Sequence, residues 1–309
     1  QAEDGIRDSV ASRGLGDVYK RQDPNSRVAV ETMGGHGKVF ITGEVTTEAK
    51  LNDGDIKRIV KQISNIDDVT IHLETQSPEI SQGVDTGGAG DQGIMIGYAC
   101  NENQEYVPQE YFLARNLNRY LYASYQTDGK TQITMNGNSL RVVASFQGAP
   151  KEQLEKKCEK FFSQFPQYRI DALHCNPAGD WDIGGFSADA GLTGRKLAVD
   201  NYGPRVPLGG GAFSGKDASK VDRSAAYMAR KIAVDILKEK EAKEVIVQLA
   251  YAIGYNQPLQ ASALVDGEHQ FVTGYDLSPN GIIEQLDLKQ PIYERTANFG
   301  HFGCGFNWR

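Results

Sequence analysis

Apolar and polar residues begin to alternate regularly at Arg27. Residues 27–33 and 38–46, RVAVETM and KVFITGEVT, alternate on the two sides of a glycine-rich turn at 34–37. Alternation with a period of two around such a turn predicts a β-hairpin. In residues 53–63 the spacing changes, and the apolar residues fall on one face of a helix: Ile56, Ile59, Val60 and Ile63. The first folded part of the chain is therefore predicted to be a strand pair followed by a helix.

Further strand pairs and helices come after this unit. Residues 131–147 predict a second hairpin that turns at Asn136-Gly137, a strong hairpin signal. Helical spacing of apolar residues predicts helices over 108–122, over 151–165 and after Lys220. The C-terminal part is further predicted to contain a strand over 244–254, a hairpin at Asp266-Gly267 and a helix capped by Ser278. Because strands come in pairs rather than alternating singly with helices, we predict an α+β fold, and three units of comparable size fit this order.

Composition and charge exclude several classes of protein. The 309 residues are enough for two or three domains, and 24% charged and 39% hydrophobic residues are ordinary for a soluble globular chain. The net charge of −7 comes without a basic tract, which argues against a nucleic-acid partner. There is no apolar run long enough for a membrane span. The four cysteines lack metal-binding spacing, so we expect reduced thiols and a cytoplasmic protein.

Residues 1–22 differ in pattern from residues 23–309. They carry neither the apolar core of a secretory signal nor a periodic hydrophobic face, so we interpret them as a leader, disordered or foreign to the fold. We divide the remainder of the chain into an N-terminal domain, truncated at its start, over 23–85, a central domain over 86–175 and a C-terminal domain over 176–309.

The segment 209–231, GGGAFSGKDASKVDRSAAYMARK, carries the strongest chemical signal. Three consecutive glycines let the backbone approach phosphate oxygens without a side-chain clash. Lys216 and Lys220 supply positive charge, and Asp222 could hold a divalent metal that bridges those oxygens. Asp217 stands where a P-loop would have a metal-binding Ser or Thr, and no strong strand precedes the loop. We predict a polyphosphate-binding loop that is not a P-loop; the alternative is a glycine-rich turn leading into an amphipathic helix.

Two other segments contain candidate binding residues. Residues 88–93 match G-x-G-x-x-G but come after no buried strand, so a tight loop that presents Asp91 is favoured over a dinucleotide fold. In 176–203, Trp181 could stack on a purine, while Asp189 and the pair Arg195-Lys196 add charge near the phosphate loop. Taken singly, Trp181 is more simply a half-buried core residue and the cations a solvated pair, but their convergence favours a nucleotide site.

No histidine or cysteine has the spacing of a nucleophile–base pair or of a metal site. Chemistry that needs a strong protein nucleophile is therefore disfavoured. A cation-rich cradle with scattered carboxylates can instead align substrates and stabilise a departing phosphate chain.

Three long motifs, GGAGDQGIMIGYA, DAGLTGRKLAVDNYG and GGGAFSGKDASKVDRSAAYMAR, closely resemble the S-adenosylmethionine synthetases (methionine adenosyltransferases), and the similarity extends over about residues 23 to 309. The resemblance implies three similar α+β domains and an active site at the interface of a homodimer, or of a dimer of dimers. It implies that the sulfur of L-methionine attacks C5′ of ATP and releases triphosphate, which is hydrolysed to pyrophosphate and phosphate. Two Mg²⁺ and one K⁺ are expected to assist.

The resemblance also assigns roles to individual residues. The residues expected to act in catalysis are Asp91, near the sulfonium, Asp189, Arg195 and Lys216. Those expected to contact ATP are Asp128, Lys130, Trp181, Asp189, Arg195, Lys196, Ala212 and Lys216. Those expected to contact methionine are Glu44, Gln82, Asp189 and Lys220. Glu31 is expected to serve the potassium ion and Asp222 a magnesium ion.

The chain departs from the family pattern in three places. The SEGHPDK motif, whose His and Asp serve the triphosphate and a magnesium ion, is absent. The stretch between Asp85 and Gly87 is shorter than usual, so we expect a curtailed gating loop and freer ligand exchange. Asp180-Trp181 replaces the usual Arg-Phe, which keeps an aromatic ring for adenine but reverses a charge. The first departure leaves an alternative open, a non-catalytic homologue that binds ATP or S-adenosylmethionine as a partner subunit.

Overall fold

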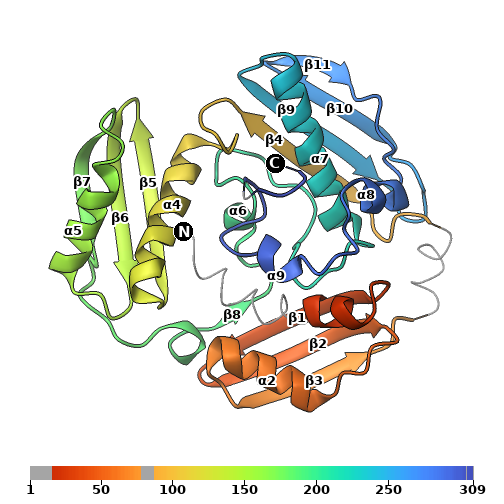
Figure 1. Ribbon diagram of the computed structural model, residues 1–309, viewed down its shortest axis with the longest axis horizontal. Helices are drawn as coiled ribbons and strands as arrows, with labels where there is room; N and C mark the ends of the chain where they lie inside the picture. The colour runs from red at the N-terminus through yellow and green to blue at the C-terminus, as the bar shows by residue number, and fades with distance from the viewer. Residues whose placement is uncertain (1–15, 78–86, 304, 309) are drawn as a thin grey trace.

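The computed structural model describes residues 16–77, 87–303 and 305–308, and it contains three β-sheets with helices packed against them (Figure 1). The first sheet has the strand order β3-β2-β1-β8. Its strands are β1 (Arg27–Gly35), β2 (Lys38–Thr46), β3 (Asp68–Glu74) and the short β8 (Gly191–Leu192). The helix α2 (Asp53–Ser64) connects β2 to β3, and Asn52 and Asp55 form a capping box at its start.

The third sheet repeats this arrangement. Its order is β5-β6-β7, with β5 (Gly129–Asn136), β6 (Ser139–Phe146) and β7 (Arg169–Cys175). In both sheets an antiparallel hairpin is followed by a helix and then by a strand parallel to the second one. The helix here is α5 (Lys151–Phe162), which packs beside α4 (Gln109–Tyr125). Two units of the chain therefore share one β-β-α-β order.

The second sheet combines distant parts of the chain. Its order is β11-β10-β9-β4, with β4 (Gly93–Cys100), β9 (Glu244–Tyr251), β10 (Gln260–Val265) and β11 (Glu268–Phe271). The long helix α7 (Val221–Glu239) lies across β4 and β9, and α8 (Pro279–Gln285) packs against α7. At Gly97 an added Cβ would lie 2.0 Å from the backbone carbonyl carbon of Ala229. The absence of a side chain at Gly97 therefore lets α7 approach the sheet closely.

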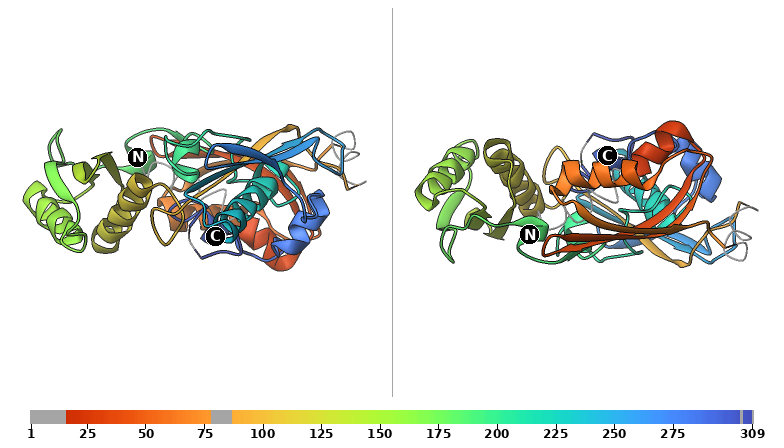
Figure 2. Two further views of the ribbon diagram at one scale, coloured as in Figure 1. Left: turned by 90° about the horizontal axis from the view of Figure 1, so that it is seen from above. Right: turned by 90° about the horizontal axis from the view of Figure 1, so that it is seen from below.

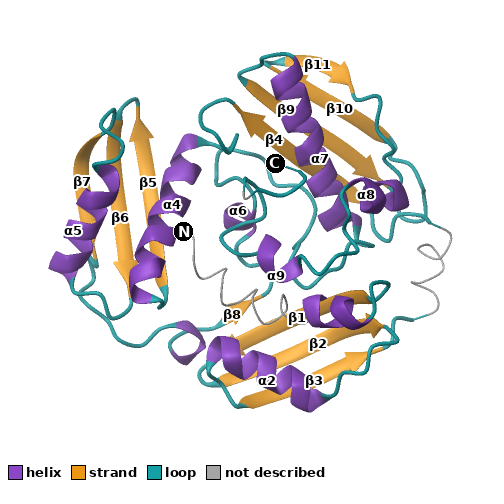
Figure 3. Ribbon diagram, viewed as in Figure 1, coloured by secondary structure: helices purple, strands orange, loops and turns teal. Residues whose placement is uncertain are grey.

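The three sheets surround a central region of loops and short helices, seen in Figure 3 as mostly teal backbone. It contains α6 (Leu197–Asp200) and α9 (Tyr293–Thr296), whereas the 3₁₀ turn η1 (Gly185–Ser187) packs against β1 of the first sheet. Buried arginines stabilise this region by donating to backbone carbonyls: Arg223 to Phe213 and Lys216, and Arg230 to Tyr106 and Glu105. Viewed from the side, the third sheet with α4 and α5 forms one end of the molecule (Figure 2).

The predicted α+β class is confirmed, and its local signals are found where the sequence places them. Both predicted hairpins are present: Asp266 and Gly267 have positive φ angles in one turn, and Gly137 has one in the other, where Asn136 ends β5 and pairs with Ser139. Ser278 caps α8 by accepting a hydrogen bond from the amide of Gly281. Within the part of the chain that the structure describes, no helix combines the length and the apolar composition that crossing a membrane requires.

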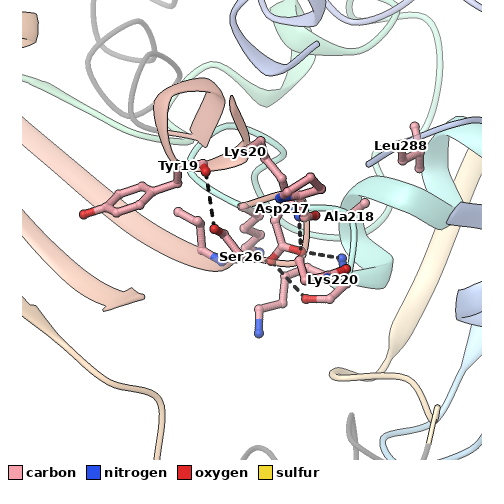
Figure 4. A network of polar contacts seen from close by, with 12 residues as sticks. Tyr19, Lys20, Ser26, Asp217, Ala218, Lys220 and Leu288 are labelled. Atoms are coloured by element: carbon pink, nitrogen blue, oxygen red, sulfur yellow. Dashed lines mark hydrogen bonds and ion pairs between the residues drawn. The ribbon is translucent and has the colours of Figure 1, made fainter. Parts of the chain in front are cut away.

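Residues 16–22, the described part of the expected leader, form a helix against the first sheet. Tyr19 is buried in the core of that sheet, and the carboxylate of Asp17 accepts hydrogen bonds from the amides of Tyr293 and Glu294. Lys20 lies beside Asp217 at the end of the phosphate loop, as Figure 4 shows. This part of the leader is therefore packed with the rest of the chain rather than standing apart from it.

Candidate active site

A cavity of about 380 Å³ opens between the third sheet and the loop 181–196. Its lining includes six of the eight residues predicted to contact ATP: Asp128, Lys130, Trp181, Asp189, Arg195 and Lys196. Asp128 and Lys130 come from the start of β5, whereas Trp181 and Asp189 precede β8 and Arg195 and Lys196 follow it. The structure thus brings together side chains from two separate sequence regions, as the nucleotide hypothesis requires.

Hydrogen bonds from the β5–β6 hairpin hold one wall of the cavity in place. The carboxylate of Asp128 accepts from the amide of Gly185 at 2.7 Å. The Gln147 side chain donates to the carbonyl of Asp182 at 2.8 Å, and the amide of Gly148 donates to the carbonyl of Trp181 at 2.8 Å. Gln147 supports the wall without lining the cavity, and sequence reasoning missed it because its position at a strand end carries no motif.

The phosphate loop is folded around a partly buried ion pair. The ammonium group of Lys216 lies 2.6 Å from one carboxylate oxygen of Asp222, and the other oxygen accepts from the amide of Gly211 at 2.8 Å. Gly210 adopts a φ of 71°, a left-handed conformation that favours glycine. The loop then runs along β1, where the amide of Val30 donates to the carbonyl of Gly215. A P-loop connects a strand to a helix, whereas this loop lies against β1. The structure therefore agrees with the prediction of a phosphate loop that is not a P-loop.

The cavity and the phosphate loop lie next to each other. Thr193 exchanges hydrogen bonds with Thr32 on β1, just after the β8 pairing. At Gly194 an added Cβ would lie 2.7 Å from the Cβ of Ala212, so the turn that carries Arg195 contacts the phosphate loop directly. The surface formed by the cavity and the adjoining loop therefore brings the turn of Arg195 against the phosphate loop, although Ala212 and Lys216 do not line the cavity itself.

Glu31 extends this surface on β1. Partial burial raises the pKa of the Glu31 carboxyl above its ordinary value, while Lys216 and Thr193 act in the opposite direction. Glu31 lies opposite Thr42 and Glu44 lies opposite Ala29 in the β1–β2 register, so both carboxylates project from the outer face of the first sheet. Neither lines the cavity described above.

The remaining predicted residues are less tightly gathered. Asp91 lies in the exposed turn before β4, where its carboxylate accepts from the amide of Gln92 at 2.8 Å. Lys220 occupies the residue before the first turn of α7, as Figure 4 shows. Gln82 falls outside the described residues.

The described residues contain no group of three or more histidine, cysteine, aspartate or glutamate side chains placed to hold a metal ion. Asp222 nevertheless suits magnesium, because Mg²⁺ is commonly held by one or two carboxylates with phosphate oxygens and waters completing its shell. The buried carboxylate of Asp222, directly beside a phosphate-type loop, provides one such ligand.

The fold and the site define an α+β protein with a cation-lined cavity beside a glycine-rich loop, and comparisons with known proteins identify its family. The family model for the S-adenosylmethionine synthetase central domain matches residues 86–167, and the model for the C-terminal domain matches 183–309. S-adenosylmethionine synthase from Brachyspira hyodysenteriae is 40% identical over 355 residues, covering 97% of this chain and 90% of the relative. The synthase from Pelagibacter ubique is 39% identical, covering 93% and 86%.

A solved structure agrees. The unusual S-adenosylmethionine synthetase from Campylobacter jejuni superposes with a TM-score of 0.88 at 31% identity, covering 99% of this chain and 93% of that one. The chain belongs to the S-adenosylmethionine synthetase family. Its alignment with the Brachyspira protein spans 355 positions, more than the 309 residues present here, so that relative has residues opposite gaps in this chain.

Proposed function

We propose that this chain synthesises S-adenosylmethionine from ATP and L-methionine. The observation that carries the proposal is the cavity lined by Trp181, Lys130 and Arg195, which joins the phosphate loop in a member of this family. The half-exposed indole of Trp181 offers a face on which adenine can stack. Lys130, Arg195, Lys196 and Lys216 then supply cations along the path that a triphosphate would take.

The reaction needs no protein nucleophile. The thioether sulfur of methionine carries the attacking electron pair, forms the bond to C5′ of ATP, and thereby breaks the bond from C5′ to the triphosphate oxygen. The sulfur lone pair becomes the new S–C5′ bond, the triphosphate leaves with the bonding pair of the broken C5′–O bond, and a sulfonium cation is produced. We propose that Asp91 and Asp189 face the developing positive charge, while the lysines and arginine stabilise the leaving group electrostatically. Hydrolysis of the triphosphate by one water then gives pyrophosphate and phosphate.

Two Mg²⁺ and one K⁺ would supply charge neutralisation for the triphosphate when bound. Asp222 is the residue that would hold a magnesium ion, since its carboxylate is fixed beside the glycines of the loop. Glu31 is the residue that would serve potassium, because its carboxylate on the outer face of the first sheet supplies oxygen ligands and negative charge. In the free protein Lys216 and Asp222 neutralise each other, so ligand binding would separate this pair.

We further propose that two copies of this chain associate through the outer face of the first sheet, as a homodimer or a dimer of dimers. Met33 lies opposite both Phe40 and Leu192 in the strand register, so the three side chains form one row. They are 47%, 48% and 39% exposed, unusually high for large apolar side chains side by side. Glu31 and Glu44 lie on the same face, which supports a methionine site completed by the second copy.

Substitution of Lys216 tests the triphosphate role. Lys216→Ala should reduce synthesis of S-adenosylmethionine by at least a hundredfold, since one preorganised cation or donor contributes about 10²–10³ in rate. Lys156→Ala, at an exposed lysine of α5, is the matched control and should retain activity. Equal activity of the two variants would contradict the role of Lys216, and ATP binding without turnover by the unmodified chain would support the non-catalytic alternative instead.

A further inference from the structure

We propose that Asp180 is a positioning residue that fixes Trp181 for nucleotide binding. The inference rests on the proposed function and concerns the position at which the family resemblance places an arginine. Asp180 does not line the cavity, whereas the adjacent Trp181 does. Asp180 would therefore act through its neighbour rather than by touching the nucleotide.

The carboxylate of Asp180 is engaged on the side away from the cavity. It accepts from the amide of Lys151, the first residue of α5, with oxygen–nitrogen distances of 3.1 and 3.4 Å. It also accepts from the side-chain amide of Asn176 at 2.9 Å. The residue that precedes α5 is Pro150, which provides no side-chain cap. Asp180 supplies the missing acceptor, and its negative charge suits the positive end of the helix dipole.

Asn176, which donates to Asp180, is itself held in place by hydrogen bonds. Its side chain donates to the carbonyl of Ala149 at 2.7 Å and accepts from the amide of Phe146 at 3.0 Å. The residue is buried, with a φ of 41°. Asn176 is thus bonded to both β6 and the loop before α5, so a carboxylate held by it has little freedom.

A second tether holds the other side of Trp181. The carbonyl of Trp181 is bonded to Gly148, and the carbonyl of Asp182 to Gln147, both at the end of the β5–β6 hairpin. The Trp181 backbone is therefore held on its N-terminal side by Asp180, and at its carbonyl and at Asp182 by the end of the β5–β6 hairpin. Loss of the first tether would leave the indole attached to the hairpin alone, so its orientation toward the cavity would be less defined.

Tryptophan fluorescence can read this effect directly. Of the two tryptophans, Trp308 is buried and stacked on Tyr227, whereas Trp181 is half-exposed at the cavity. ATP with Mg²⁺ and without methionine would be titrated into the wild-type protein, Asp180→Ala and Asp180→Asn. Trp181→Phe identifies the source of the signal. Asp171→Asn is the matched charge control, because that aspartate is paired with Arg169 on β7.

We expect Asp180→Ala to raise the dissociation constant for ATP by roughly two- to tenfold, the range expected when one loosened side chain has to be ordered on binding. Asp180→Asn, which keeps an acceptor oxygen, should recover most of the affinity, and Asp171→Asn should equal the wild type. In steady state Asp180→Ala should raise KM for ATP and leave KM for methionine unchanged.

Wild-type affinity in a folded Asp180→Ala protein would overturn the positioning role alone. Equal losses for ATP and methionine, with a lowered unfolding midpoint, would also overturn it, because they indicate general destabilisation. Absence of ATP binding by the wild-type protein would instead overturn the proposed function.

Discussion

Lys216 and Asp222 form an ion pair at 2.6 Å inside the phosphate loop, and the same aspartate accepts the amide of Gly211. The side chain of Asp222 is almost fully buried, while that of Lys216 is 21% exposed. The two charged groups are therefore paired with each other at the point where a metal-bound triphosphate would bind. Binding would exchange one set of charge interactions for another, without leaving a buried charge unpaired.

Asp222→Asn should preserve the shape of the loop and abolish most of the turnover. The amide oxygen can still accept from Gly211, but it lacks the charge that suits magnesium, so we expect activity to fall by a factor on the order of a hundred or more. The measurement is initial rate against Mg²⁺ concentration. Asp235→Asn, in another aspartate–lysine pair on α7, is the control and should remain active. Full activity of Asp222→Asn would exclude the proposed metal role.

Glu31→Gln should change how stability depends on pH. Partial burial raises the pKa of Glu31 in the folded protein above its ordinary value of 4.5, so folding favours the protonated form. The stabilisation from this group is complete below the ordinary pKa and is lost as pH rises through the raised pKa. Relative to wild type, Glu31→Gln should therefore gain stability as the pH rises above about 4.5, the ordinary pKa of the carboxyl group. Urea unfolding at several pH values measures this, and a pH-independent difference would contradict it.

Gly97→Ala should destabilise the second sheet. The new methyl group would meet the backbone of Ala229 on α7 rather than a movable side chain, so α7 would have to shift. We expect a loss of about 1–3 kcal/mol or more in the free energy of unfolding, measured with urea. Gly93→Ala in the same strand is the matched control, because its nearest neighbour is the flexible end of Met95. Equal effects of the two substitutions would argue against close packing of α7 at Gly97.

Met33→Lys combined with Phe40→Lys should weaken self-association. Two charges in the exposed row of the first sheet would have to be desolvated when two copies meet there. Light scattering after size-exclusion chromatography measures the mass of the assembly. Phe271→Lys, at an 83% exposed residue on β11, controls for surface charge and should leave the mass unchanged. An unchanged mass for the double variant would place the interface elsewhere.

Local sequence signals predicted much of this fold, and the limits of that prediction are physical. Turn chemistry at Asn136-Gly137 and helical spacing after Lys220 depend on neighbouring residues, so both could be predicted. The pairing of β4 with β9 joins residues about 150 positions apart and leaves no mark in local periodicity. The second sheet therefore emerged only from the structure.

The same contrast applies to the site. Trp181, Arg195 and Lys216 could be proposed because long motifs surround them. Gln147 and Asp180 could not, because their roles depend on which backbone groups the folded chain brings beside them. In the sequence Asp180 was notable only as a reversed charge beside Trp181, whereas the structure shows its carboxylate bonded to the amide of Lys151 at the start of α5.

The central claim is that this chain joins methionine to ATP. The most direct measurement is a mass-spectrometric assay of the unmodified chain with ¹³C-methyl methionine, ATP, Mg²⁺ and K⁺, with Lys216→Ala as the negative control. We predict labelled S-adenosylmethionine together with equal amounts of pyrophosphate and phosphate. Phosphate release without labelled product, or no reaction while ATP binds, would contradict the claim.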